Sequence, residues 1–405
     1  MNLNDMDLQQ YCALNRARFY VDPFADAEWF FGNREVEADV LRRIQGDLDV
    51  RGVPKLGVVG RFGIGKTHTL NHIKWLVETE PSTYPLRPFL MDVVWDENNK
   101  ELNSWRAVHV RILDAMGEPF LREAVRRFDE KTKTGGSELS DAIYKTFRFG
   151  DENLKRSEAI VLADYFRRDV RSTVPAWQWL KAERGAKAEA LGVPKLIQDA
   201  GDMVFTVLNI GCLFREASGL GILLLMDEAQ SLGDVRKADS EVHRAFLKLA
   251  EPDNRDVGFV LAIFGGGVAQ IPKVLTTPED IISRLGVTRA SLNEAFVELQ
   301  RVLRTQPDIR SFMDEILDHL IVPSAAAQII ADAELSGVSP GRLPFTDGAL
   351  DKLAKALHGR EENRNPRIII SKLAEACSRA YRSAKSAGAY QLVDDTIVDK
   401  VTANI

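Results

Sequence analysis

Eight residues near the start of the chain have the types and spacing needed to hold a chain of phosphates. The segment from Gly60 to Thr67 fits the pattern GxxxxGK[ST] and directly follows a short apolar run. Glycines let the backbone curl so that its N–H groups surround a phosphate, and Lys66 would place its charge on the β and γ phosphates. The Thr67 hydroxyl is a ligand type that Mg²⁺ accepts. The sequence therefore predicts a nucleotide phosphate site here, with a plain glycine turn as the weaker alternative.

We call this segment the P-loop, because it would carry a strand into the N-terminus of a helix. The residues predicted to contact the nucleotide from this segment and the position after it are Gly60, Phe62, Gly63, Ile64, Gly65, Lys66, Thr67 and His68.

Two adjacent carboxylates follow a second apolar run. Residues 221–226 are apolar throughout, and Asp227 and Glu228 come directly after them. The carboxyl ends of parallel strands face the ligand crevice, so Asp227 is predicted to hold Mg²⁺ together with Thr67. Glu228 is predicted to activate the water that attacks the γ-phosphate. The alternative is that Asp227 caps the next helix and Glu228 is only solvated.

The elements that must position these groups alternate between strand and helix. Apolar runs predict strands at 55–60, 88–95, 221–226 and 258–264, with a weaker one at 295–299. Helical spacing predicts helices at about 36–50, 66–78, 104–116 and 238–249, and helices throughout 117–220 apart from a mobile loop at 131–137. This alternation predicts an α/β fold with a parallel five-stranded sheet.

Two domains are predicted from the same pattern. Residues 1–305 form the α/β nucleotide-binding domain, which contains a large helical insertion at about 117–220. Residues 306–405 form an all-α lid domain, broken by a loop at 337–344.

The composition is that of an ordinary globular protein. The chain has 405 residues, 45% of them hydrophobic, and a net charge of −6, which argues against a globally basic nucleic-acid binder. Cys12, Cys212 and Cys377 are scattered and lack CxxC spacing, so neither a disulfide framework nor a zinc site is indicated. We expect no signal peptide and no membrane segment, and a cytoplasmic location.

The order of these motifs resembles the AAA+ ATPases. A P-loop, then an apolar strand closed by Asp227 and Glu228, then a helical lid, is similar to the branch of origin-recognition proteins, transposition regulators and STAND-like signalling ATPases. The resemblance implies a three-layer P-loop NTPase fold with ATP and Mg²⁺ as cofactors. It also implies a ring or filament of identical copies that acts on DNA or recruits an effector protein.

Three further segments extend the resemblance. The segment 31–35, Phe-Gly-Asn-Arg-Glu, is similar to the F-x-GRE motif and implies that Phe31 lies near the adenine, although Asn33 interrupts the motif. The segment 280–286 resembles the one that carries an arginine finger, which implies Arg284, with Arg289 in reserve. Asn365-Pro-Arg367 resembles the sensor-two motif, which implies that Arg367 reaches the nucleotide from the lid. The alternatives are a plain helix start for the first segment and surface arginines for the other two.

One difference from the AAA+ pattern concerns the rate of ATP hydrolysis. A polar sensor-one residue is expected after the strand 258–264, but this chain has Gly265-Gly-Gly267 there. Backbone groups, Gln230 or a water would have to orient the attacking water, or hydrolysis is slow. The alternative to an ATPase is therefore a slow or non-hydrolysing switch or scaffold that recruits an effector.

The insertion carries a looser resemblance. Residues 177–180, 191–193 and 217–222 look similar to the ATP-binding proteins of BREX-type anti-phage systems, which implies a setting in phage defence. Its runs of alternating charge, such as 122–131, indicate a solvated helix face. A face that contacts the phosphates of DNA is the alternative.

Overall fold

The computed structural model describes residues 6–17, 19–32, 34–93, 104–134, 138–167, 173–230, 245, 248–265, 296–299 and 303–403. These form two compact units. The sheet unit comprises Asp39–Gly60 and Thr69–Glu298. The helical unit comprises Met1–Ala38, Arg61–His68 and Leu299–Ile405. The predicted division at residue 305 stays a prediction about domains.

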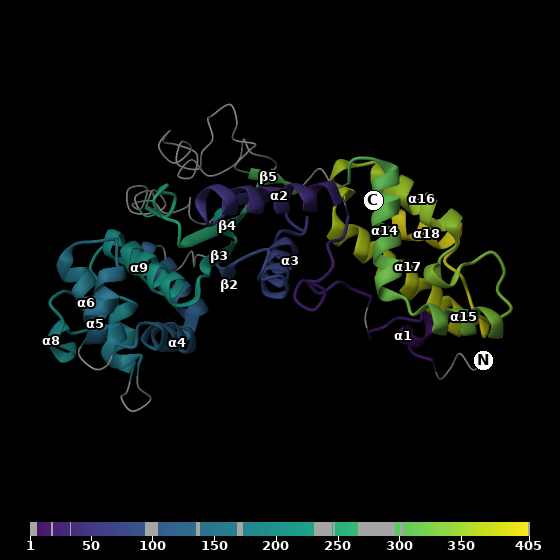
Figure 1. The fold of residues 1–405 in the computed structure, drawn as a ribbon. Coiled ribbons are helices and arrows are strands. Elements are labelled where there is room, and N and C mark those ends of the chain that lie inside the picture. Colours follow the sequence, from purple (N-terminus) through teal and green to yellow (C-terminus); the bar gives the residue numbers. More distant parts are fainter. Residues whose placement is uncertain are drawn as a thin grey trace. The chain divides into compact units, whose positions relative to one another are not determined.

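A parallel five-stranded sheet forms the centre of the sheet unit (Figure 1). Its strands are β1 (Lys55–Gly60), β2 (Leu86–Asp92), β3 (Gly221–Asp227), β4 (Val257–Phe264) and β5 (Phe296–Glu298). The order across the sheet is β2-β3-β4-β1-β5, and every neighbouring pair is parallel. Every residue of β1 and β3 is buried, which explains the apolar runs 56–59 and 221–226 inside them. The predicted α/β fold with a parallel five-stranded sheet is confirmed.

The predicted helical insertion is also confirmed, and it begins earlier than expected. Its helices are α4 (Trp105–Thr132), α5 (Glu138–Thr146), α6 (Glu152–Tyr165), α7 (Val174–Leu180), α8 (Ala188–Leu191) and α9 (Ala200–Ser218). The prediction ended a helix at Met116; α4 instead bends at Gly117, where φ is 74°, and continues. The expected loop at 131–137 was wrong at its start, because helix α4 extends to Thr132 and Lys133 caps it.

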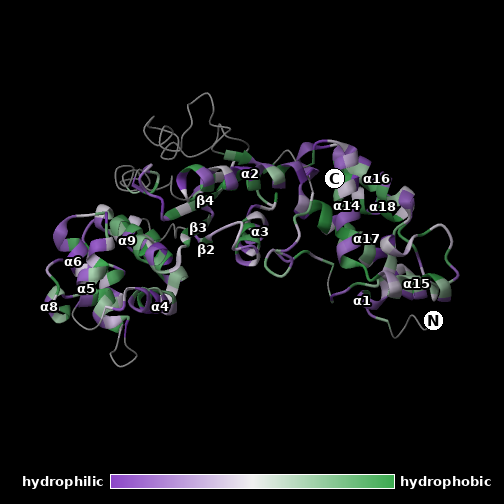
Figure 2. Cartoon of the chain, in the orientation of Figure 1, coloured by the Kyte–Doolittle hydropathy of each residue, from purple (hydrophilic) through white to green (hydrophobic). Residues whose placement is uncertain are grey.

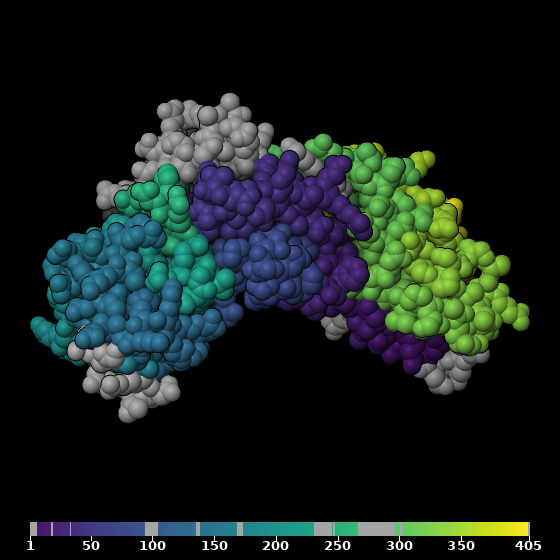
Figure 3. Space-filling model, in the orientation of Figure 1, coloured from purple at the N-terminus to yellow at the C-terminus, as the bar shows by residue number. Residues whose placement is uncertain are grey.

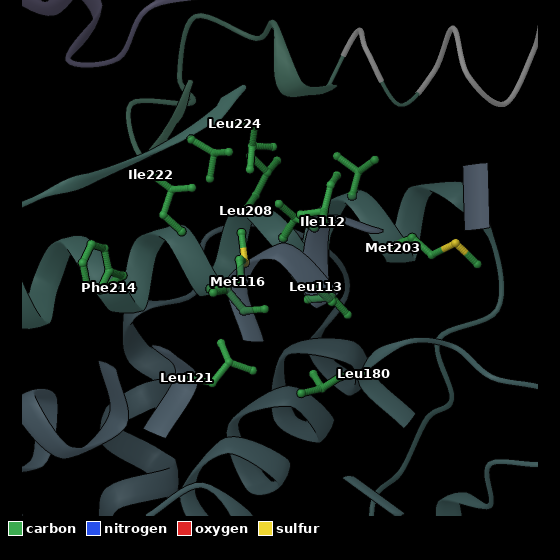
Figure 4. Packing of buried hydrophobic residues seen from close by; sticks show 14 of the residues in the cluster. Ile112, Leu113, Met116, Leu121, Leu180, Met203, Leu208, Phe214, Ile222 and Leu224 are labelled. Atoms are coloured by element: carbon green, nitrogen blue, oxygen red, sulfur yellow. The ribbon is translucent and has the colours of Figure 1, made fainter. Parts of the chain in front are cut away.

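The insertion shares one hydrophobic core with the sheet. Helix α4 packs on α9 and on β2, and α9 packs on β3 and β4. Figure 4 shows Ile112 and Met116 of α4 and Leu208 of α9 gathered beside Ile222 and Leu224 of β3. Helix α9 is largely hydrophobic in Figure 2, and the space-filling view in Figure 3 shows the blue and teal insertion as one continuous body. The insertion is therefore part of the sheet unit's core.

Two helices flank β1 along the chain. They are α2 (Arg34–Arg51) and α3 (Lys66–Thr79), and both agree with the predicted helices. Only Ala245 and 248–249 of the predicted helix 238–249 fall within the described residues.

The helical unit contains no strand among its described residues. Its helices are α1 (Leu8–Tyr11), α14 (Gln306–Leu320), α15 (Pro323–Asp332), α16 (Asp347–His358), α17 (Pro366–Ala387) and α18 (Asp395–Thr402), with short 3₁₀ turns η5 (Pro340–Arg342) and η6 (Glu361–Asn363). Side chains cap the starts of several helices: Thr305 and Asp308 form a capping box on α14, and Asp394 caps α18. The helical C-terminal region is confirmed.

The N-terminal segment packs onto these helices, which the sequence did not indicate. Leu14 pairs with Ile321 in an isolated antiparallel bridge, and the Asn15 N–H donates to Leu320 O at 2.8 Å. The Tyr390 hydroxyl donates to Tyr11 O at 2.7 Å, and the two rings stack with centroids 4.4 Å apart. These contacts join the segment before α2 to the end of α14 and to the segment between α17 and α18.

Candidate nucleotide site

The P-loop has the backbone conformation that its glycines permit. Gly63 and Gly65 have φ of 78° and 103°, a region that costs any other residue steric strain. A Cβ added at Gly65 would meet nothing within 4 Å, so the backbone conformation alone requires glycine there. At Gly63 a Cβ would lie 2.7 Å from Asn365 Oδ1, so this glycine also permits a close approach. Both positions therefore require glycine in the curled backbone of this loop.

Lys66 and Thr67 open helix α3. Lys66 is only 6% exposed, and its Nζ donates to Arg61 O at 3.3 Å, across the turn of the loop. Thr67 is half-buried one residue later. The N–H groups and dipole at the start of a helix favour an anion, so these two residues stand where a phosphate is stabilised.

The first turn of α17 contacts the P-loop within the helical unit. The Asn365 side chain donates from Nδ2 to Phe62 O at 2.5 Å, while its Oδ1 accepts from the Arg367 N–H at 2.9 Å. The Arg367 guanidinium lies over the Phe62 ring, 4.9 Å from the centroid. The resemblance to sensor two predicted that Arg367 lies by the nucleotide, and the structure places its side chain on the P-loop residue Phe62.

A cavity of about 450 Å³ lies beside this contact. Its lining residues are Phe62, Asn363, Asn365, Arg367, Ile368, Ser371 and Lys372. Two cations, three neutral polar side chains and an exposed aromatic ring therefore surround a space that opens next to the P-loop. Such a lining suits an anionic ligand with a flat apolar part.

Phe31 lies against two histidines. Its ring centroid is 5.5 Å from that of His68, the residue after the P-loop, and 5.2 Å from that of His319 on α14. The Gly32 N–H donates to Glu315 Oε2 at 2.8 Å, which fixes the backbone after Phe31. Asn33, which interrupts the motif, lies outside the described residues. The segment predicted to lie near the base thus contacts the residue next to the P-loop within the helical unit.

A buried ion-pair cluster supports this aromatic group. Asp26 is 2% exposed, and it accepts from Arg16 at 2.7 Å and lies 2.8 Å from His319 Nε2. Burial by itself raises the pKa of Asp26, but hydrogen bonds from Arg16 and His319 outweigh it and hold that pKa at about 2. Asp26 is therefore ionised at neutral pH and orients His319, which in turn contacts Phe31.

In the sheet unit, the two acidic residues stand at the carboxyl edge of the sheet. Asp227 is the last residue of β3 and is 3% exposed, and its Oδ1 accepts from the Glu228 N–H at 2.8 Å. Glu228 has φ of 54°, a strained conformation for a residue with a Cβ. Gly60 ends β1 at the same edge, and β4 alone separates β1 from β3, so Asp227 and Gly60 are about 10 Å apart across the sheet.

Asp92 is a third carboxylate at this edge that the sequence reasoning missed. It ends β2 and pairs in register with Asp227. Burial and the negative charge of Asp227 raise the pKa of Asp92. A divalent cation at this edge would reverse that effect and favour the ionised form. The sequence shows this carboxylate inside the predicted strand 88–95, whereas in the structure the strand ends at Asp92.

Strand β4 ends directly before the three glycines 265–267, where the sequence predicts its end. Phe264 is its last residue and is 48% exposed, and the following Gly265 N–H donates to Gly60 O at 3.2 Å. Gly266 and Gly267 lie outside the described residues. Over the part of the chain that the structure describes, β4 therefore carries no polar side chain at its carboxyl end.

The two candidates for the arginine finger, Arg284 and Arg289, lie outside the described residues. They stay predictions.

The charged run on α4 pairs with itself. Arg122, Arg126 and Arg127 form ion pairs with Glu118, Glu130 and Glu123, at 2.8, 2.6 and 2.5 Å, each four residues away. Internal pairing of this kind is typical of a solvated helix face, the first of the two interpretations of the insertion's charges.

A larger cavity, about 630 Å³, lies away from the strand ends that carry Asp227 and Gly60. Asp256, directly before β4 and 2% exposed, accepts from Arg148 and lies 3.0 Å from Arg215 Nε. This network joins the loop after α5 to α9 and to the start of β4, so we assign it to the stability of the insertion.

Within the described residues, no group of His, Cys, Asp and Glu side chains has the arrangement of a metal site. Nor does any helix in those ranges have the length and apolarity to span a membrane.

Comparison with known proteins gives structural neighbours only. No family model matches the chain, and no curated protein matches it. Among solved structures, the chain is similar to the Orc1 protein of Aeropyrum pernix, solved in complex with DNA, with 11% identity and a TM-score of 0.42 over 97% of this chain and 68% of that one. It is also similar to Cdc6p of Pyrobaculum aerophilum, with 11% identity and a TM-score of 0.43 over 90% of this chain and 65% of that one.

The fold itself defines a structural class. A parallel sheet in the order β2-β3-β4-β1-β5, with the glycine-rich segment 60–67 after β1 and a carboxylate pair at the end of β3, is an α/β fold.

Proposed function

We propose that the chain binds ATP with Mg²⁺ and hydrolyses it. The observation that supports this most is the common edge at which β1 delivers Gly60 to the P-loop and β3 ends at Asp227, with Glu228 directly after it. In this proposal the P-loop backbone and Lys66 hold the phosphates, and Thr67 with Asp227 holds Mg²⁺.

Three more residues have roles in the proposal. Glu228 activates the attacking water, Phe31 packs near the base, and Arg367 reports the state of the nucleotide to the helices around α17. The contact of Arg367 and Asn365 with Phe62 supports the last role.

Calorimetry with Mg·ATP tests nucleotide binding. We expect the wild type to bind and Lys66→Ala to lose about 10-fold to 100-fold in affinity, because one charged hydrogen bond contributes about 1.5–3 kcal/mol. Lys187→Ala, which removes an exposed lysine in the insertion, is the matched control and should bind as the wild type does. Absence of heat with the wild type at millimolar ATP, or equal affinity in Lys66→Ala, would remove the proposal.

We further propose that copies assemble through the nucleotide site, with Arg284 completing the site of a neighbour. A guanidinium stays charged at every physiological pH and suits a γ-phosphate. Mass measurement should give more than the 45.2 kDa monomer with ATP and the monomer with ADP. Arg284→Ala should stay monomeric with ATP. The same mass with both nucleotides would contradict assembly at this site.

The molecule on which the proposed ATPase acts is proposed on the AAA+ resemblance alone. It is DNA or a partner protein, in the cytoplasm, and repeating the mass measurement with duplex DNA separates the two targets.

A role in phage defence rests on the resemblance of 177–180, 191–193 and 217–222 to BREX-type proteins. Deleting the gene and comparing phage infection would test it.

The second candidate function is a nucleotide-dependent switch or scaffold that recruits an effector with little turnover. The observation that favours it is the end of β4, where Phe264 and Gly265 provide no polar side chain to orient water. The two candidate functions predict different rates of steady-state phosphate release. Comparing the wild type with Glu228→Gln distinguishes them.

A further inference from the structure

A single amide side chain joins the ends of β3 and β4. Gln230 lies three residues beyond Asp227, and its Nε2 donates to Glu228 Oε2. Its Oε1 accepts from the Phe264 N–H, the last residue of β4, at 2.9 Å. Gln230 therefore connects the carboxylate of Glu228 to the backbone at the strand end where a polar sensor residue is missing.

The chemistry of the amide fixes the direction of this bridge. The Phe264 N–H is a donor, so it must face the amide oxygen of Gln230, and the NH₂ group then points to Glu228. The reverse orientation would place two donors together and two acceptors together. A carboxylate cannot replace this amide, because an ionised carboxylate only accepts.

Glu228 needs such a partner. Its backbone is held in the left-handed region at φ 54°, with its N–H bonded to Asp227 Oδ1. Its carboxylate is half-buried and lies among the charges of Asp227 and Asp92. In the described parts of the chain, the donor to this carboxylate is Gln230. A general base must be held within hydrogen-bond reach of its water, and a misplacement of about 1 Å costs about 100-fold in rate.

We propose that Gln230 is the positioning residue for Glu228 and takes the place of a sensor side chain after β4. It acts from the turn after β3, and it fixes the carboxylate relative to the backbone of Phe264. The inference rests on the proposed hydrolysis of ATP and deepens the assignment of its site.

Kinetics of Gln230 variants test the inference. We expect Gln230→Ala to lower kcat for phosphate release about 10-fold to 100-fold, because the base loses its orientation. The Kd for Mg·ATP should stay within about two-fold, since Gln230 is assigned no contact with the phosphates. Gln230→Glu keeps the size but removes the donor, and should lose at least as much. Gln178→Ala, an exposed glutamine on α7, is the matched control.

A double variant separates positioning from a general structural role. If Gln230 acts through Glu228, Gln230→Ala has no further effect on kcat in a Glu228→Gln background. An equal loss in both backgrounds, a weaker Kd or a lowered melting temperature would mean a structural role and overturns the inference. Wild-type or faster turnover in Gln230→Ala, beside an inactive Glu228→Gln, overturns it and leaves the proposed function standing. A wild type that releases no phosphate removes the proposed hydrolysis, and this inference with it.

Discussion

Replacing Glu228 by Gln is expected to lower steady-state phosphate release by about 10²-fold to 10⁴-fold, the usual contribution of a positioned general base. The reason is that Gln keeps the shape of the side chain but cannot take a proton from water. ATP should still bind, because Lys66 and the P-loop backbone are unchanged. Phosphate release and the Kd for Mg·ATP, measured on the same preparation, check both parts of this expectation.

Glu216→Gln is the matched control for this variant. It makes the same chemical change at an exposed carboxylate on α9 that pairs with Lys131. Its turnover should equal that of the wild type. A wild type no faster than Glu228→Gln, with and without DNA, would contradict hydrolysis. The switch or scaffold function would then be the better description.

The strands that carry the site were predictable because a strand buried on both faces is apolar along almost its whole length. Strand β3 is apolar until Asp227, and its predicted and observed ends differ by one residue. Strand β2 was harder. It lies at an edge of the sheet, where Pro88 is tolerated inside a strand, so the prediction started it at Pro88 and the structure starts it at Leu86.

The helices of the insertion were predictable in kind but not in length. Gly117 and Pro119 are typical of a helix end, and a prediction from local sequence stops there. In the structure α4 bends at Gly117 and continues, because its second half buries Phe120, Leu121 and Val125 in the core shared with α9. Tertiary packing outweighs the local signal.

The candidate site was predictable only where a local motif carries it. The glycines and Lys66 form one continuous pattern, and their conformation agrees with it. The bridge from Gln230 to Phe264 joins residues distant in the chain, so only the fold reveals which group it reaches. The same holds for His319 and Glu315, which lie beside Phe31 through the packing of α14 and have no motif of their own.

The largest expected effect on stability comes from Glu158, which lies on α6 inside the insertion. It is 1% exposed, its Oε1 lies within hydrogen-bond distance of Thr206 Oγ1 at 2.7 Å, and its Oε2 accepts from Asn209 Nδ2 at 2.7 Å. Burial, which outweighs these hydrogen bonds, raises the pKa of Glu158 from its ordinary value of 4.5 to about 8. The folded chain therefore keeps a proton on Glu158 at neutral pH that the unfolded chain has lost.

The sign of the pH dependence follows from that raised pKa. Between about pH 4.5 and pH 8 the folded state binds more protons at Glu158 than the unfolded state, so this residue lowers the free energy of unfolding as pH rises, and its effect levels off above pH 8. Gln has the shape and hydrogen bonding of the protonated acid. It can donate to Thr206 Oγ1, whose own proton goes to Asp202 O at 2.9 Å, and still accept from Asn209.

We therefore expect Glu158→Gln to equal the wild type near pH 4.5 and to be more stable at pH 9 by on the order of 4 kcal/mol. Denaturant unfolding of the full chain across this pH range measures the difference. Glu183→Gln, an exposed glutamate of the insertion, is the matched control and should show no pH-dependent difference. A variant less stable than the wild type at pH 9 would mean that the carboxylate stays ionised, because the hydrogen bonds from Thr206 and Asn209 would then outweigh the cost of burying its charge.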